Sequence, residues 1–345
     1  MTKQIMVGGV AVGGGTPVTI QSMCNTKTED AGATIEQILR LEQVGCEIVR
    51  VTVPTPEAAE AVETIKNSIH IPLVADIHFD YRLAIAAAEH GADKIRINPG
   101  NIGSPERVRM VADACRERGV PIRVGVNSGS VEKGLLEKYG LCAKSLCESA
   151  LGHVKLLEDC GFEDICISVK ASDVAMTVEA NRLLSTLCDY PLHIGVTEAG
   201  TKERGILKSA AGIGALLLDG IGDTIRISLT DAPEEEAHAG GELLRALGLR
   251  SGVQFVSCPS CGRTEYDLIG TAKAVETRLR DKPWNITVAV MGCVVNGPGE
   301  ASHADYGIAG GKSEGVIFKH GEPVARVASD KLADALVELI ERENQ

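Results

Sequence analysis

Aromatic residues and positive charge are both scarce in this chain. Four Phe, five Tyr and one Trp make up 3% of the 345 residues, and Asp and Glu outnumber Lys and Arg by 47 to 35. Few rings are therefore present to stack on bases, and a net charge of -12 repels phosphate backbones and anionic membrane surfaces. These two shortages argue against binding to nucleic acid.

Long apolar runs and a secretion signal are also missing. No stretch approaches the roughly 18 apolar residues that a membrane span requires. The first twenty residues lack the charged start and continuous apolar run of a signal peptide. The 11 cysteines are diluted over the whole chain, unlike those of a small secreted domain. We therefore expect a globular protein of the reducing cytoplasm, with no membrane span and no disulfide framework.

Short β-branched runs recur between segments with helical periodicity. A serine cap followed by proline at Ser104-Pro105 begins one such helix, and Gly45, Gly91 and Gly119 stand before the next strand as helix terminators. Eight strand-helix units within about 250 residues predict a closed (β/α)₈ barrel of the TIM type, an α/β fold, rather than an open doubly wound sheet. The expected strands are residues 18–23, 48–53, 73–78, 94–99, 122–127, 165–170, 192–197 and 224–229.

The pattern changes near residue 250, after an acidic helix that begins at Pro233 and a glycine-bounded linker at residues 248–252. We assign residues 1–249 to the barrel and 250–345 to a small α/β domain. Its expected strands are 253–257, 286–291 and two short ones within 316–328, and its expected helices are about 267–280 and one from Asp330. The glycine-rich start should form a hairpin that plugs the barrel bottom, because no strand precedes it and no Lys-Ser or Lys-Thr follows it as in a phosphate loop.

Polar side chains gather where the expected barrel strands end, which is where TIM barrels carry out their reactions. Many of them are two or four residues apart and so lie on one face of a strand. Five are cations on five different strands, and unpaired cations repel by several kcal/mol at an effective dielectric constant of about 20. A diphosphate would neutralise them, whereas local ion pairs or outward orientation would be the simpler explanation. The residues are Arg50, Asp76, His78, Arg96, Asn98, Arg123, Asn127, Lys170, Glu198, Arg226 and Ser228.

Three cysteines in the last quarter of the chain have the chemistry of metal ligands. Cys258 and Cys261 lie in Cys-Pro-Ser-Cys-Gly-Arg, and Cys293 lies in Gly-Cys-Val-Val-Asn-Gly-Pro-Gly-Glu. A thioredoxin-type redox pair and a structural zinc site completed by Glu300 are the alternatives. The glycines around Cys293 let the backbone wrap closely around a buried anion, which favours an iron-sulfur cluster. Glu300 would then hold the fourth iron through an oxygen that a substrate oxygen can displace.

Seven stretches of the chain resemble one known family, the iron-sulfur 4-hydroxy-3-methylbut-2-enyl diphosphate synthases of the bacterial isoprenoid pathway, called GcpE or IspG. The resemblance covers essentially the whole chain, without the insert domain of the plant enzymes. The matching stretches are Val-Arg-Val-Thr-Val-Pro, Val-Ala-Asp-Ile-His-Phe, Ile-Arg-Ile-Asn-Pro-Gly-Asn-Ile-Gly, Ile-Arg-Val-Gly-Val-Asn-Ser-Gly-Ser, Gly-Val-Thr-Glu-Ala-Gly, Ser-Cys-Pro-Ser-Cys-Gly-Arg and Val-Asn-Gly-Pro-Gly-Glu.

The resemblance implies a reaction, a cofactor and a set of roles. The reaction is the reductive ring opening and dehydration of 2-C-methyl-D-erythritol 2,4-cyclodiphosphate, with electrons delivered one at a time by flavodoxin or ferredoxin. Glu198 would face the reacting carbons as a proton donor. Asp76 and His78 would shape the pocket and bind substrate hydroxyls. The remaining assignments are a diphosphate grip by Arg50, Arg96, Arg123, Lys170 and Arg226, neutral hydrogen bonds from Asn98, Asn127 and Ser228, and a [4Fe-4S] cluster held by Cys258, Cys261, Cys293 and Glu300.

The resemblance also implies an assembly, because the expected linker is short and electrons must reach the substrate over contact distance. Similar proteins form a head-to-tail homodimer in which the cluster domain of one chain caps the barrel of the other, and closure would exclude water. Three function classes follow from the residues: an iron-sulfur reductase, a zinc-stabilised barrel lyase or aldolase, and an electron carrier whose barrel is only a scaffold. Iron content and turnover of the cyclic diphosphate distinguish them.

Overall fold

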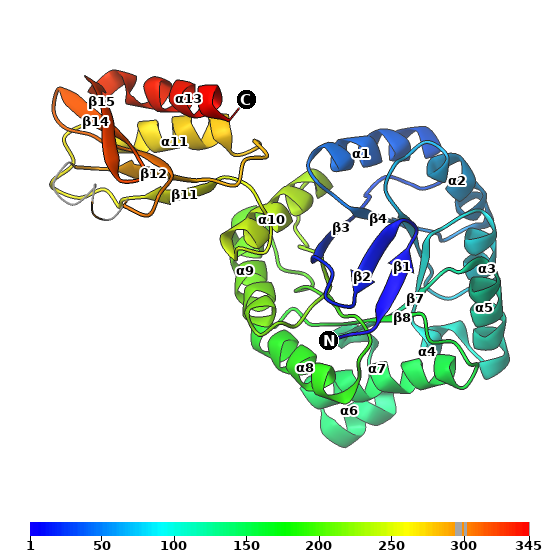
Figure 1. Cartoon of the computed structure of the whole chain (residues 1–345). Helices are drawn as coiled ribbons and strands as arrows, with labels where there is room; N and C mark the ends of the chain where they lie inside the picture. Colours follow the sequence, from blue (N-terminus) through cyan, green and yellow to red (C-terminus); the bar gives the residue numbers. More distant parts are fainter. Residues whose placement is uncertain (294–298, 300–301, 345) are drawn as a thin grey trace. The chain divides into compact units, whose positions relative to one another are not determined.

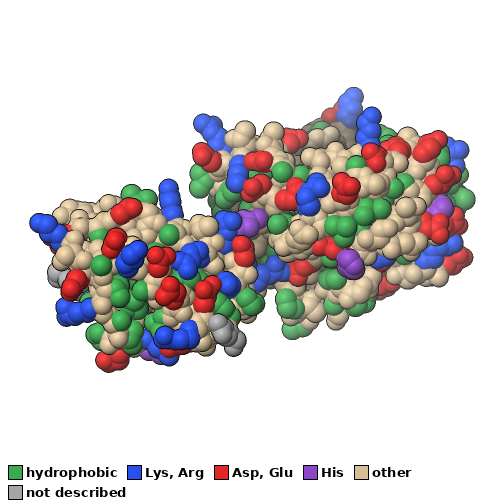
Figure 2. All heavy atoms as spheres, turned by 90° about the horizontal axis from the view of Figure 1, so that it is seen from above, with side chains coloured by type: hydrophobic (Ala, Val, Ile, Leu, Met, Phe, Trp, Pro, Cys, Tyr) green, Lys and Arg blue, Asp and Glu red, His purple; other side chains and the backbone are tan. Residues whose placement is uncertain are grey.

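The computed structural model describes residues 1–293, 299 and 302–344. The chain divides into two compact units, Met1–Leu243 and Leu244–Gln345. On the face seen in Figure 2, acidic and basic side chains are interspersed, so the negative net charge is not gathered there into one patch. No helix among the described residues is long and apolar enough to cross a membrane.

The first unit is a barrel of eight parallel strands, as the sequence predicts (Figure 1). The neighbour order is β8-β7-β6-β5-β4-β3-β10-β9, and a parallel bridge between Ile167 of β8 and Leu192, just before β9, joins the two ends. The strands are β3 (Thr19–Met23), β4 (Ile48–Thr52), β5 (Leu73–Asp76), β6 (Lys94–Ile97), β7 (Ile122–Asn127), β8 (Ile165–Lys170), β9 (His193–Ile194) and β10 (Thr224–Ile225).

Strands β9 and β10 are shorter than the six residues expected for each. Beyond Ile194 and Ile225, the two segments leave the regular ladder at the mouth of the barrel. At this point the backbone at Gly195 lies close to Arg226 and Lys170. Only glycine fits there, because a Cβ would lie 2.4 Å from the carbonyl oxygen of Arg226 and 2.8 Å from Lys170 Nζ. The β-branched composition of these runs does not reveal such crowding, so the predicted ends were too late.

Helices surround the barrel (Figure 1). Their ends follow local signals: the Thr55 side chain accepts a hydrogen bond from the Ala58 amide at the start of α2, and Gly119 ends α5 in the left-handed conformation at φ 64°. The helices are α1 (Ala31–Gln43), α2 (Pro56–Lys66), α3 (Tyr81–Glu89), α4 (Pro99–Ile102), α5 (Pro105–Arg118), α6 (Lys133–Tyr139), α7 (Ala143–Glu158), α8 (Val174–Leu187), α9 (Lys202–Leu218) and α10 (Pro233–Ala246).

An antiparallel hairpin closes one end of the barrel. Strands β1 (Gln4–Val7) and β2 (Val10–Gly13) pair with each other, as the glycine-rich start predicts. Ile5, Val7 and Val12 of the hairpin pack against inward-facing residues near the start of the barrel strands, and all of these side chains are buried. The barrel partners are Ile48, Val74 and Cys166.

The second unit is a five-stranded sheet with helices packed on it. Strands β11 (Gln254–Ser257), β12 (Thr287–Met291) and β13 (Tyr306–Ala309) are parallel, and β14 (Glu314–Lys319) and β15 (Glu322–Ala328) continue the sheet antiparallel. Helices α11 (Leu268–Leu279) and α13 (Leu332–Glu343) bury their apolar faces in one core with it. The sequence did not predict β13, a four-residue strand that contains Gly307, whose missing Cβ leaves room for the Phe318 ring.

We expect the packing of the hairpin on the barrel base to stabilise the barrel. Val12 is fully buried in the cluster that it forms with the barrel base. Val12→Ala should lower the free energy of unfolding by about 2 kcal/mol, because it removes buried methyl groups and leaves a cavity. Urea unfolding followed by circular dichroism measures this. Val10→Ala, at a half-buried position of the same hairpin, should cost clearly less; equal losses would contradict the plug.

Candidate active site

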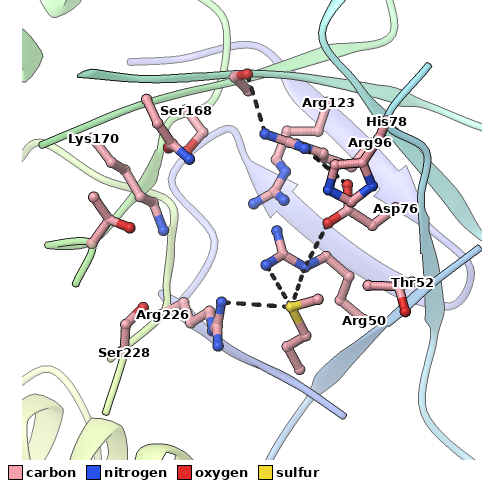
Figure 3. Close-up of a pocket in the computed structure, with 14 residues that line it drawn as sticks. Arg50, Thr52, Asp76, His78, Arg96, Arg123, Ser168, Lys170, Arg226 and Ser228 are labelled. Atoms are coloured by element: carbon pink, nitrogen blue, oxygen red, sulfur yellow. Dashed lines mark hydrogen bonds and ion pairs between the residues drawn. The ribbon is translucent and has the colours of Figure 1, made fainter. Parts of the chain in front are cut away.

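A pocket of about 220 Å³ opens at the carboxyl ends of the barrel strands (Figure 3). Side chains from β3 to β8 and from the segments that follow β9 and β10 point into it, because alternate residues of each strand face the barrel interior. The five expected cations are all present. The lining residues are Met23, Arg50, Thr52, Asp76, His78, Arg96, Arg123, Gly125, Asn127, Ser168, Lys170, Thr197, Arg226 and Ser228.

Asp76 holds two of the cations. Its Oδ1 accepts a hydrogen bond from Arg96 Nη1 at 3.0 Å, and its Oδ2 lies 3.6 Å from Arg50 Nε. Burial alone would raise the pKa of Asp76, but Arg50 and Arg96 outweigh burial and lower it to about 2. Arg96 also donates to the Gly125 carbonyl at 3.3 Å, and a Cβ at Gly125 would lie 2.6 Å from Arg96 Nε. Glycine is therefore required beside this guanidinium.

Glu236 holds a third cation. Its carboxylate accepts hydrogen bonds from Arg226 at 3.2 and 3.3 Å, from Ser22 Oγ at 3.1 Å and from the Leu229 amide at 3.0 Å. The side chain of Met23 lies between two of the cations, with its sulfur 2.7 Å from Arg50 Nη2 and 3.7 Å from Arg226 Nη1. Glu236 lies in the acidic first turn of α10, which is the signal that could have marked it in the sequence.

Arg123 and Lys170 make no ion pair with an acid in the part of the chain that the structure describes. Both are nearly buried, and Arg123 Nε lacks a hydrogen-bond partner. Burial, reinforced by neighbouring guanidinium groups, lowers the pKa of Arg123 to about 10 and that of Lys170 well below its ordinary value. The pocket is thus a site with uncompensated positive charge, which suits a polyanion.

Two of the expected site residues lie outside the pocket lining. Asn98 is buried, and its side chain accepts a hydrogen bond from the Gly100 amide at the start of α4. Glu198 is exposed and follows the lining residue Thr197, with its backbone in the left-handed region at φ 51°. For a residue with a Cβ this conformation costs about 1–2 kcal/mol, so the surrounding loop holds Glu198 in place at some expense.

Sequence analysis missed five lining residues. Thr52 and Ser168 lie two positions from Arg50 and Lys170, so strict alternation along β4 and β8 could have found them. Met23, Gly125 and Thr197 carry no charge, and nothing in the sequence distinguishes them from core or loop residues.

The three cysteines of the second unit follow two neighbouring strands. Cys258 comes directly after β11, Cys293 lies two residues beyond β12, and these strands are parallel neighbours. A Cβ built at Gly292 would lie 3.8 Å from Cys258 Sγ, so Gly292 brings the Cys293 segment against that sulfur. Cys261 is exposed, and hydrogen bonds from Arg263 lower the pKa of its thiol, which favours a thiolate.

The chemistry of this donor set fits an iron-sulfur cluster, since three soft sulfur ligands come from one end of one small sheet. Among the described residues, no three His, Cys, Asp or Glu side chains are arranged to hold a single metal ion. Ligands of one zinc ion would lie about 2.3 Å from a shared centre, whereas thiolates of a cluster each bind a different iron. Glu300, the expected fourth ligand, lies outside the described residues.

Comparison with solved structures defines the class of the first unit. Dihydropteroate synthase from Yersinia pestis superimposes with a TM-score of 0.52 at 13% identity, over 72% of this chain and 98% of its own. A truncated 3-deoxy-D-arabino-heptulosonate 7-phosphate synthase from Thermotoga maritima superimposes with a TM-score of 0.53 at 15% identity, over 72% of this chain and 94% of its own. At these identities the likeness is one of fold alone, and the shared fold is the (β/α)₈ barrel.

Family models and curated relatives are more specific. Residues 2–241 match the GcpE TIM-barrel domain, and residues 254–342 match the GcpE protein C-terminal domain. A relative from Geobacter sulfurreducens is 57% identical over 343 residues, which are 99% of this chain and 97% of its own. A relative from Fusobacterium nucleatum is 55% identical over 341 residues, which are 98% of this chain and 96% of its own. Both are named 4-hydroxy-3-methylbut-2-en-1-yl diphosphate synthase (flavodoxin).

This chain belongs to the GcpE family. The family is one of iron-sulfur enzymes, in agreement with the donor set of the second unit.

Asp76→Asn tests how the pocket is held together. The folded pKa of Asp76, about 2, lies below the ordinary 3.8, so its charge stabilises the fold above about pH 4 and this contribution is lost as pH falls through 2. Removing the charge at pH 7 should cost about 3 kcal/mol of unfolding free energy, because two buried guanidinium groups lose their carboxylate. Added pyrophosphate should restore part of that loss, as thermal unfolding will measure.

Asp80→Asn is the matched control for this substitution. Asp80 pairs with exposed Arg82 and caps α3, a role that Asn also fills. Its change should stay within about 0.5 kcal/mol and should not respond to pyrophosphate. An Asp76→Asn protein as stable as the unmodified one between pH 4 and 7 would contradict the role given to this carboxylate.

Proposed function

We propose that this chain is a 4-hydroxy-3-methylbut-2-en-1-yl diphosphate synthase. It opens the ring of 2-C-methyl-D-erythritol 2,4-cyclodiphosphate and removes water, in the non-mevalonate isoprenoid pathway. Two electrons and one proton convert the dianionic cyclic diphosphate into the trianionic open diphosphate and water. The observation that carries the proposal is the pocket in which five cations face only two carboxylates among the described residues.

The cations of the pocket divide into two groups with different tasks. Arg50, Arg96 and Arg226 are held in position by Asp76 and Glu236, so their guanidinium groups are oriented before the substrate enters. Arg123 and Lys170 have no acidic partner among the described residues, and they supply the charge that the diphosphate neutralises. Because the three paired guanidinium groups are oriented in advance, little reorganisation of them accompanies binding.

Neutral groups complete the grip on the substrate. Asn127 and Ser228 line the pocket and donate hydrogen bonds to phosphate or hydroxyl oxygens, and His78 and Asp76 shape its wall. Asn98 acts one step away, by holding the start of α4. Glu198 donates the proton that leaves in water, from the position that follows the lining residue Thr197 in the chain.

Residues 1–249 bind the substrate in this proposal, and residues 250–345 hold a [4Fe-4S] cluster. Cys258, Cys261 and Cys293 bind three of its irons and Glu300 the fourth. The cluster supplies electrons one at a time and a Lewis-acidic iron. The lowered pKa of Cys261 favours the thiolate form that binds iron at this position, and a reducing cytoplasm would keep the three cysteines free of disulfides.

Flavodoxin is the proposed electron donor, because the relatives carry it in their names, and ferredoxin is the alternative. The two units differ in charge: residues 1–243 contain 34 Asp and Glu against 23 Lys and Arg, whereas residues 244–345 contain 13 against 12. An acidic carrier is therefore repelled by the first unit and tolerated by the second, where the cysteines lie.

We further propose a head-to-tail homodimer in which the second unit of one chain caps the barrel mouth of its partner. The barrel mouth offers an apolar contact point at Phe79, which follows the lining residue His78 and is 72% exposed. Burying this ring under a cap would also exclude water from the pocket and strengthen its charge interactions.

Cys293→Ser and Glu198→Gln separate the two halves of the mechanism. Cys293→Ser should lose iron and activity together. Glu198→Gln should keep its visible absorption but lower kcat about 100-fold, as expected for a general acid. The assay is anaerobic turnover of the cyclic diphosphate with dithionite and an artificial mediator, followed by product identification.

Two variants control for this experiment. Cys160→Ser changes a half-buried barrel cysteine and should keep its iron, and Glu179→Gln changes an exposed carboxylate on α8 and should keep full activity. Unmodified protein that holds iron yet leaves the cyclic diphosphate unchanged would overturn the proposed function. Full activity of Glu198→Gln would overturn only the proton-donor role.

Mixing two inactive variants tests the dimer. Arg123→Met damages the barrel and Cys293→Ser damages the cysteine unit. In a head-to-tail dimer, one site of each mixed dimer combines an intact barrel with an intact partner unit, so co-expression in equal amounts should restore about a quarter of the activity. Activity that stays at the level of the single variants would mean that each site is built from one chain.

A further inference from the structure

Lys94 is a fully buried lysine inside the barrel, below the pocket. It is the first residue of β6 and lies two residues before Arg96, so both side chains face the barrel interior. Arg96 lines the pocket, whereas Val74, the partner of Lys94 in the β-ladder, packs on the hairpin at the base. Lys94 therefore lies in the layer between the plug and the mouth, with 0% of its surface exposed.

Among the described residues, no acidic group pairs with Lys94. Its Nζ has no hydrogen-bond partner, and no ion pair to it is found in the described residues. The neighbouring strands offer further cations and polar groups, and Asp76 of β5 is engaged one layer higher by arginines. The titratable and charged groups that face this interior are Arg50 of β4, Asp76 of β5, Arg123 of β7, Cys166 and Lys170 of β8 and His193 of β9.

Other polar atoms near Lys94, one of them on Arg123 of the pocket lining, also lack hydrogen-bond partners among the described residues. Arg123 Nε and both ring nitrogens of His193 also lack partners. Burial and the nearby cations keep His193 neutral by lowering its pKa well below the ordinary value. The interior beneath the mouth thus holds polar groups without partners among the described residues, and the cations among them attract an anion bound in the mouth.

Such a lysine is costly to the folded chain. Burial, opposed by Cys166 and reinforced by Arg123 and Arg50, lowers the pKa of Lys94 from 10.5 to about 8. An apolar side chain of the same length would fill this position without any desolvation of charge. The stability of the fold therefore does not explain a lysine at this position. An anionic ligand that interacts favourably with its charge would explain it.

We propose that Lys94 is a buried counter-charge for the diphosphate: it takes up a proton as the anion binds in the mouth above it, and its charge strengthens the anion's binding without touching it. This inference rests on the proposed function and adds to it a group outside the pocket lining. It also suits the chemistry, because ring opening frees a phosphate oxygen and the bound anion gains one negative charge.

The direction of the pH effect follows from linkage. A bound anion raises the pKa of Lys94 above its free value of about 8. The added affinity is fully present below that free pKa and is lost as pH rises through the higher pKa of the complex. Each unit of this rise corresponds to about tenfold in affinity. The cyclic diphosphate has no ionisation of its own in this range, since each phosphorus carries one strongly acidic group.

Calorimetry measures both consequences. Titration of the unmodified protein with the cyclic diphosphate at pH 9, in two buffers of different ionisation enthalpy, should give net proton uptake. The Kd should weaken about tenfold between pH 7 and pH 10. Lys94→Met should take up distinctly fewer protons at pH 9 and bind about tenfold more weakly at pH 7, and the two proteins should converge toward pH 10.

Stability gives an independent readout. Lys94→Met should unfold at the same temperature as the unmodified protein or higher at pH 7, because it removes an uncompensated buried charge. A residue of purely structural importance would lose stability and affinity together. Lys155→Met, which removes an exposed lysine paired with Asp159 on the barrel surface, is the control and should leave affinity and proton uptake unchanged.

The outcomes are distinguishable. Equal affinity and equal proton uptake in Lys94→Met and the unmodified protein would overturn the inference while leaving the proposed function intact. If the variant fails to fold, the absence of net uptake by the unmodified protein at pH 9 overturns it equally. Unmodified protein that does not bind the cyclic diphosphate at all would overturn the proposed function, and this inference with it.

Discussion

The mutual repulsion of cations at the barrel mouth is the constraint around which the first unit is organised. The buried carboxylate of Asp76 holds two guanidinium groups and that of Glu236 holds one, and the Met23 sulfur lies between Arg50 and Arg226. These contacts fix directions but leave a surplus of positive charge. The fold tolerates that surplus because the barrel strands are covered by helices and sealed by the hairpin, so the unfavourable charge is offset by a large apolar core.

Alternation along strands explains why so much of this site could be predicted from the sequence. Lys170 and Arg226 lie at or just past the ends of their strands, and Arg50, Arg96 and Arg123 lie at inward-facing positions within theirs. The closed barrel brings these positions together whatever the distance between them in sequence. The β-branched runs predicted the location of all eight barrel strands. Glycines with positive φ end helices where the sequence predicted it. Local chemistry and global topology agree at these positions.

The parts that escaped prediction depend on contacts between distant residues. The early ends of β9 and β10 lie where Gly195 closely approaches Arg226 and Lys170, a contact between distant residues that composition does not encode. Glu236 enters the site from the first turn of α10, and Asn98 turns to the backbone of α4 although its position suggested the pocket. Strand β13 has only four residues, one of them a glycine, so its sequence resembles that of a loop. Cys258 and Cys293 are 35 positions apart in the numbering, yet their strands are neighbours, so only their residue type pointed to a shared role.

The hairpin at the barrel base limits how substrate and product can enter and leave the pocket. Because β1 and β2 fill that end with buried apolar side chains, molecules reach and leave the described pocket by the mouth. Spent ligand must therefore depart along the route by which the next one arrives, and the two exclude each other while either is inside. We therefore expect the product to inhibit the enzyme competitively, so that a high substrate concentration overcomes the inhibition.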